Sequence, residues 1–85
     1  MDSREREEFR AVIRKNFGNN VRILRTAKGW TQQQLADALK WHRITVTRIE
    51  NGINLPHYDD ACQMADALGV DVGRLRVDLF EAKKN

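Results

Sequence analysis

The chain has 85 residues, with 15 Lys and Arg against 12 Asp and Glu and a formal net charge of +3. This length allows one small domain, and the single cysteine, Cys62, excludes an intrachain disulfide, so we expect a protein of the reducing cytoplasm. No signal peptide and no apolar run approaching the roughly 18 residues of a membrane span are present, so we expect no membrane anchor.

The first predicted element is an amphipathic helix over residues 4–16. Asp2 and Glu5 fit a capping box in front of it. Its apolar residues recur at helical spacing, and they are Phe9, Val12, Ile13 and Phe17. The Gly-Asn-Asn sequence of residues 18–20 either ends this helix or lies inside one that continues to Lys28, and the pattern leaves both alternatives open.

Two short helices joined by a tight turn are predicted within residues 30–52. Thr31 and Gln34 fit a capping box at the start of the first helix, which covers residues 32–39. Its buried stripe is Leu35, Ala36 and Leu39. The second helix covers residues 43–50 and ends before a glycine, the usual terminator.

One face of the second helix is not needed to form the hydrophobic core. At about 100° per residue, Val46 and Ile49 fall on its inner side. The outer side carries two long cations, two hydrogen-bonding side chains and one aliphatic, namely Arg43, Ile44, Thr47, Arg48 and Asn51. Such groups can read base edges and thymine methyls in a DNA major groove. An ordinary helical hairpin would not leave an isoleucine on this polar face.

Two further helices are predicted after a loop over residues 53–57. The first covers residues 58–68, ends at Gly69 and buries Ala61, Met64, Ala65 and Leu68. The second begins after Asp71, a good capping residue. Apolar residues continue at spacings that fit either a helix or a strand, and we favour a helix; they are Val72, Leu75, Val77 and Leu79.

The segment of residues 30–52 resembles the helix-turn-helix of the phage-repressor family, which includes Cro, the lambda-type repressors and many small bacterial regulators. The family's small alanine falls on Ala36, and its closing Glu-x-Gly falls on Glu50 and Gly52. The resemblance runs from Gly18 to Leu75 and includes Val21, Leu24, Arg25, Leu35, Val46, Ile49, Pro56, Ala65, Leu68, Gly69 and Val70. It implies an all-α, five-helix, lambda-repressor-like DNA-binding domain.

The expected organisation has three parts. Residues 1–17 form an N-terminal helical extension, residues 18–76 the helix-turn-helix domain, and residues 77–85 a C-terminal tail that is a candidate dimer contact.

The turn between the two short helices departs from the family pattern. Lys40 stands where the family usually has glycine, so a non-glycine residue is expected at positive φ, at a cost of about 1 kcal/mol. Trp41 replaces a small aliphatic residue, and His42 replaces the usual serine or threonine cap. Because histidine caps poorly, His42 is either a phosphate or base contact or a turn residue with no role.

Charge is distributed unevenly along the chain. Residues 22–48 contain six Lys or Arg and one acid, whereas residues 49–73 contain five acids and no Lys or Arg. A cationic half that carries the helix-turn-helix suits a polyanion.

An enzyme is not expected. The candidates for nucleophilic, acid–base or metal chemistry are His42, His57, Asp59, Asp60 and Cys62. No pair of them has the i, i+4 spacing of two strong metal ligands on a helix, and no glycine-rich phosphate loop is present. We therefore predict no cofactor and no metal.

The resemblance implies a transcriptional regulator that binds an inverted-repeat operator on double-stranded DNA as a homodimer. An antitoxin or a protein-interaction module on the same fold is the alternative, and a second regulatory protein as partner stays open. By resemblance, base readout falls to Arg43, Ile44, Thr47 and Arg48. DNA-backbone contacts fall to Gln32, His42, Thr45, Asn51 and Asn54.

Two further predictions concern contacts between helices and between subunits. Glu50 lies at the edge of a buried face and requires a partner, and the resemblance supplies Arg25. The dimer interface is assigned to the apolar residues left after the family core is filled, with support from Phe9 or Val12. These residues are Val72, Leu75, Leu79 and Phe80.

Overall fold

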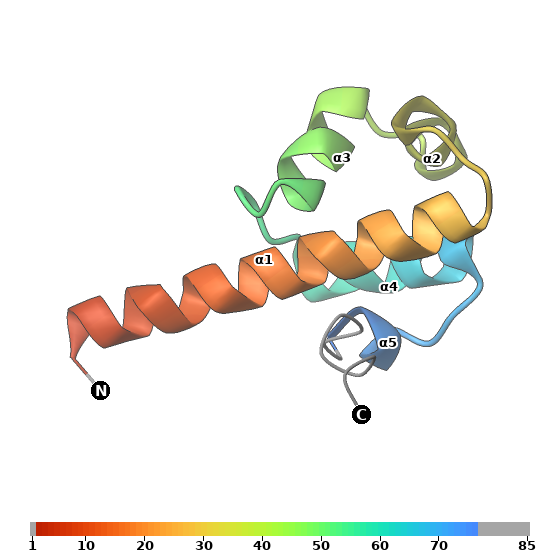
Figure 1. Cartoon of the computed structure of the whole chain (residues 1–85). Coiled ribbons are helices and arrows are strands. Elements are labelled where there is room, and N and C mark those ends of the chain that lie inside the picture. Colours follow the sequence, from red (N-terminus) through yellow and green to blue (C-terminus); the bar gives the residue numbers. More distant parts are fainter. Residues whose placement is uncertain (1, 77–85) are drawn as a thin grey trace.

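The computed structural model describes residues 2–76, and this part of the chain folds into α-helices without a strand (Figure 1). The helices are α1 (Ser3–Ala27), α2 (Gln32–Leu39), α3 (Arg43–Glu50), α4 (Tyr58–Leu68) and α5 (Gly73–Arg76). The predicted all-α, five-helix fold is confirmed. None of the described helices is long and apolar enough to cross a membrane.

Helix α1 is continuous through Gly18, so the second of the two alternatives for this segment is correct. The carboxylate of Asp2 caps its first turn by accepting a hydrogen bond from the backbone N–H of Glu5 at 2.8 Å. A Cβ at Gly18 would collide with the backbone oxygen of Ile49 and would lie 2.8 Å from that of Glu50. The glycine therefore marks the closest approach of α1 and α3, not the end of a helix.

The core forms where α1 packs against α3, α4 and α5, and where α2 packs against α3 and α4. In Figure 1, α2 and α3 lie on one side of α1 and α5 lies on the other. The buried apolar residues are Phe17, Val21, Leu35, Ala36, Leu39, Val46, Ile49, Ala61, Met64, Ala65, Leu68 and Leu75. Every helix contributes at least one of them, so the helices depend on each other for burial.

One residue assigned to the dimer interface belongs to this core instead. Leu75 is 0% exposed, and its carbonyl accepts a hydrogen bond from the buried Asn20 side chain at 2.8 Å. Leu75 is the buried residue of α5, which lies against α1, so it cannot offer surface to a second subunit. Val72 is half-buried and packs on the same core, while Leu79 and Phe80 lie outside the described residues.

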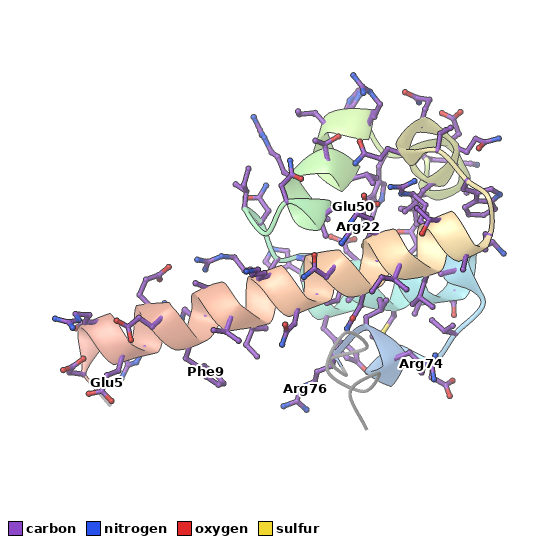
Figure 2. All side chains as sticks on the ribbon, viewed as in Figure 1. Glu5, Phe9, Arg22, Glu50, Arg74 and Arg76 are labelled. Atoms are coloured by element: carbon purple, nitrogen blue, oxygen red, sulfur yellow. The ribbon has the colours of Figure 1, made fainter. Side chains whose placement is uncertain are left out.

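The N-terminal part of α1 runs past the rest of the fold. Figure 2 shows Glu5 and Phe9 on the segment of α1 that projects beyond the other helices. Residues 2–12 are all exposed, and burial begins gradually from Ile13. We call residues 3–14 the α1 extension.

The turn between α2 and α3 has the backbone conformation expected from the sequence. Lys40 has φ 61° and ψ 39°, the left-handed conformation, and it is the one described non-glycine residue with positive φ. The N–H of Trp41 donates to the carbonyl of Ala36 at 2.9 Å, which closes the end of α2. The predicted positive φ at Lys40 is thereby confirmed.

Lys40→Gly is expected to be more stable than Lys40→Ala by about 0.5–1 kcal/mol in free energy of unfolding. Both variants remove the ammonium group, and only alanine keeps the Cβ that makes the left-handed conformation unfavourable. Urea unfolding of the two variants measures the difference. Equal stabilities would show that the turn relaxes without strain.

Candidate nucleic-acid interface

Helix α3 turns a polar face to solvent and an apolar face to the core. Val46 and Ile49 are 0% and 2% exposed, whereas Arg43 and Arg48 are exposed. Ile44, on the same outer side, is 53% exposed. A branched aliphatic held in water between two arginines adds nothing to the core, so this face is available to a ligand.

The C-terminal end of α3 is joined to α1 by the ion pair that the resemblance implied. Arg25 and Glu50 form a two-pronged contact, with Nε to Oε2 at 2.6 Å and Nη2 to Oε1 at 3.0 Å. Their side chains are 11% and 1% exposed, and Glu50 lies between α3 and α1 (Figure 2). The hydrogen bond to Glu50 raises the pKa of Arg25 above its ordinary value, although burial acts in the opposite direction. The remaining Nη1 of Arg25 donates to the Trp30 carbonyl at 2.7 Å.

The ion pair continues into a network that joins α2 to α3. The amide nitrogen of Gln32 donates to Glu50 Oε1 at 3.1 Å, and the hydroxyl of Thr47 donates to Gln32 Oε1 at 2.8 Å. The sequence pattern did not reveal this network, and it assigned Gln32 and Thr47 only to DNA contacts. The one sequence signal for it is that a buried carboxylate needs more than one donor. The amide and hydroxyl therefore fix the angle between the two helices.

The other residues assigned to the DNA backbone surround the ends of α3. His42 precedes the helix, is exposed and makes no side-chain cap, so the first-turn amides have no side-chain acceptor. Asn51 and Asn54 are exposed at the opposite end. Thr45 is half-buried and lies on a flank of α3, about 100° from Ile44 around the helix. The structure thus brings these residues to one region without placing them all on one face.

The described residues 2–76 offer little for a different chemistry. They contain no group of three His, Cys, Asp or Glu side chains placed to hold a metal ion. Cys62 is half-buried on α4 and forms no disulfide. A pair of short helices at a steep turn, with an exposed polar face on the second, defines a helix-turn-helix DNA-binding domain.

Comparisons with known proteins give the family. A family model described as a helix-turn-helix domain matches residues 16–79, most of the chain. The chain therefore belongs to the helix-turn-helix domain family, whose members are DNA-binding regulators and not enzymes. The matched range begins at residue 16, so the α1 extension precedes it.

Solved structures and a curated relative resemble the chain to different extents. A hypothetical transcription factor, NHTF from Neisseria, is 30% identical with a TM-score of 0.78, over 85% of this chain and 83% of that one. The restriction-modification controller protein C.AhdI from Aeromonas hydrophila is 32% identical with a TM-score of 0.70, over 73% and 94%. The competence pilus inhibition repressor of Acinetobacter baylyi is 46% identical over 37 residues, which span 44% of this chain and 34% of that repressor.

Proposed function

We propose that this chain regulates transcription by binding an inverted-repeat operator on double-stranded DNA as a homodimer, with α3 in the major groove. The observation that carries the proposal is the exposed outer face of α3, where Ile44 is 53% exposed beside Arg43 and Arg48. The names of the similar proteins, a hypothetical transcription factor, a repressor and a restriction-modification controller protein, support the regulatory part of this proposal.

The proposed base contacts follow from the chemistry of this face. Arg43 or Arg48 pairs with O6 and N7 of a guanine, and Ile44 packs on a thymine methyl. Thr47 stands on the same face, but its hydroxyl lies 2.8 Å from Gln32 Oε1 and 3.1 Å from the Arg43 carbonyl, two acceptors within the protein for its one proton, so it offers DNA a methyl group and an acceptor.

The proposed contacts to the DNA backbone hold α3, the recognition helix, in register with the bases. His42, Thr45, Asn51 and Asn54 surround α3 and present polar side chains toward the phosphates that would flank the groove. Gln32 occupies the N-terminus of α2, where helix amides favour an anion. Because its amide also holds Glu50, Gln32 acts on DNA chiefly by fixing α2.

A homodimer is proposed because one recognition helix reads too few base pairs for useful specificity. Two copies related by a two-fold axis place their recognition helices about 34–36 Å apart, one turn of DNA, and read two inverted half-sites.

Arg48→Ala is expected to weaken operator binding by about 1–3 kcal/mol and to relax base preference at one position of each half-site. The reason is the loss of a bidentate guanine contact. Selection of bound oligonucleotides from a random pool, done with wild type and variant, gives the preference at every position and the spacing of half-sites.

The matched control is Arg74→Ala, which removes an exposed arginine from α5, on the other side of α1 from α3 (Figures 1 and 2). It should leave the selected sequence unchanged. If Arg43→Ala and Arg48→Ala both select the wild-type sequence, α3 is not the reading element.

A further inference from the structure

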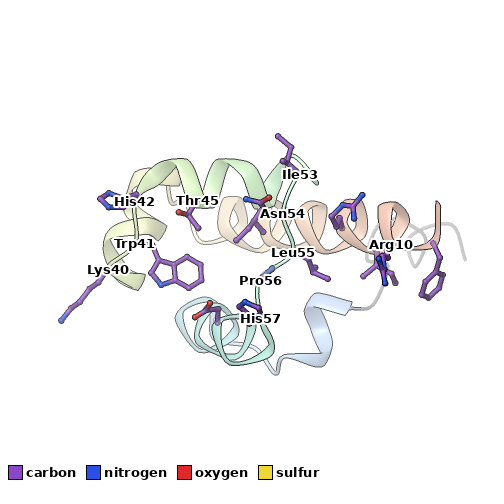
Figure 3. Close-up of a pocket in the computed structure, with 15 residues that line it drawn as sticks. Arg10, Lys40, Trp41, His42, Thr45, Ile53, Asn54, Leu55, Pro56 and His57 are labelled. Atoms are coloured by element: carbon purple, nitrogen blue, oxygen red, sulfur yellow. The ribbon is translucent and has the colours of Figure 1, made fainter. Parts of the chain in front are cut away.

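A groove of about 940 Å³ lies beside the recognition helix (Figure 3). It is bounded by the α1 extension, one flank of α3 and the loop that leads into α4. Its apolar lining includes Phe9, Ile13, Trp41, Ile53, Leu55 and Pro56. Phe9, Ile53 and Leu55 are 55%, 60% and 47% exposed. An apolar surface left this open in a small domain is typical of a site for a protein partner.

Both basic and acidic side chains line the groove, and Lys40 adds a cation from the turn between α2 and α3. Arg10 and Arg14, one helical turn apart, line it from the α1 extension, and Asp60 lines it from the first turn of α4. Arg14 is already held by Glu7 at 2.7 Å. Neither Arg10 nor Asp60 forms an ion pair with another residue in the described part of the chain.

We propose that this groove is the contact surface for a second copy of this chain. The α1 extension of each copy lies across the groove of the other, so that Arg10 of one copy meets the partner's Asp60 and the apolar lining residues pack between them. The inference rests on the homodimer of the proposed function and assigns its interface to the α1 extension and the loop before α4.

Self-complementarity favours a second copy over another occupant. A two-fold axis makes every contact occur twice, so one surface that presents Arg10 from the α1 extension and Asp60 from α4 can form the same ion pair at both symmetric positions. The apolar residues between the charged ones give the usual arrangement of an apolar centre with a polar rim. A small molecule would leave much of its own surface in water here, because the groove walls are themselves about half exposed.

The groove is also compatible with DNA binding. Thr45 lines it from the flank of α3 and projects about 160° from Thr47 around the helix. A partner seated in the groove therefore leaves Arg43, Ile44 and Thr47 free to read bases. His42, Thr45 and Asn54 line the groove as well, so in the dimer they face the partner, and of the proposed DNA-backbone contacts Gln32 and Asn51 lie outside the groove.

The test uses two charge reversals, Arg10→Glu and Asp60→Lys, in the full chain. Each variant alone sets like charges against each other at both symmetric contacts, so its dimer should dissociate about tenfold or more readily than wild type. An equimolar mixture of the two variants restores an attractive contact in a heterodimer. Sedimentation at tens of micromolar, free and on a palindromic operator, should show two weakened proteins separately and a dimer on mixing.

Matched controls change the same charges outside the groove. Arg4→Glu lies on another side of the α1 extension, and Asp66→Lys lies near the other end of α4; both should dimerise as wild type does. Circular dichroism checks that each variant is helical, and recovery on mixing cannot come from an unfolded chain.

Two results would overturn the inference in different ways. If the charge reversals leave the dimer intact while Leu79→Asp with Phe80→Asp dissociates it, the homodimer stands and the groove is not its interface. If the wild type stays monomeric both free and on the palindromic operator, the homodimer of the proposed function fails as well.

Discussion

Replacing Gly18 with alanine is expected to lower the free energy of unfolding by about 2–3 kcal/mol, although alanine is the better helix former. The added Cβ would meet the backbone oxygens of Ile49 and Glu50, the latter at 2.8 Å. Neither can rotate away as the end of a side chain would, so α1 and α3 must separate. Separation also lengthens the contact between Arg25 and Glu50.

Urea unfolding checks this prediction, with Gly73→Ala as the matched control. A Cβ at Gly73 meets no atom within 4 Å, and the residue lies in helix α5. Its replacement should be neutral or stabilising by up to about 1 kcal/mol, because only helix propensity changes. The sign of the change in the free energy of unfolding is therefore the test. If Gly18→Ala is more stable than wild type, α1 and α3 are not in close contact.

Glu50→Ala is expected to destabilise the fold even more than Gly18→Ala, by about 3–5 kcal/mol. It leaves the Arg25 guanidinium, in a side chain only 11% exposed, with the Trp30 carbonyl as its remaining protein acceptor. It also removes the acceptor of Gln32, whose own oxygen orients Thr47 on α3. Loss of one carboxylate thus disturbs three helices at once.

The double variant Arg25→Met with Glu50→Leu separates an unpaired buried charge from a loss of packing. It should recover much of the stability lost in Glu50→Ala, because no charge is left unpaired. Glu8→Ala breaks an ion pair whose side chains are 89% and 67% exposed, and its unfolding curve should overlay that of wild type. A double variant no more stable than Glu50→Ala would show that the residues act through packing and not through charge.

The helices of the recognition motif follow from signals within a few residues of each other. Thr31 and Gln34 form both hydrogen bonds of the capping box, at 3.0 and 2.8 Å, and α2 begins as the sequence predicted. Val46 and Ile49 are buried, and Ile44 is exposed, as a period of about 3.6 residues requires. These features depend on backbone geometry and side-chain periodicity, which any short stretch of sequence carries in full.

Gly18 shows where local signals become ambiguous. Gly-Asn-Asn is a good helix terminator in isolation, yet α1 passes through it, and Asn20 is 1% exposed with its amide on the Leu75 carbonyl. The partners that keep this segment helical come from α3 and α5, 31 or more residues further along the chain. No window of sequence around Gly18 contains them.

The amino-acid sequence alone predicts five helices, although it leaves the end of the first one open, and it identifies the inner and outer faces of α3 and the chemistry of the recognition face. Which apolar residues close the core and which stay open depends on the packing of the helices in three dimensions. That packing buries Leu75 and leaves Phe9 and Leu55 about half exposed beside Arg10 and Asp60. Periodicity identifies the apolar side of a helix, but whether that side meets a neighbour depends on how far the neighbouring helices reach, and α1 is longer than the helices packed against it.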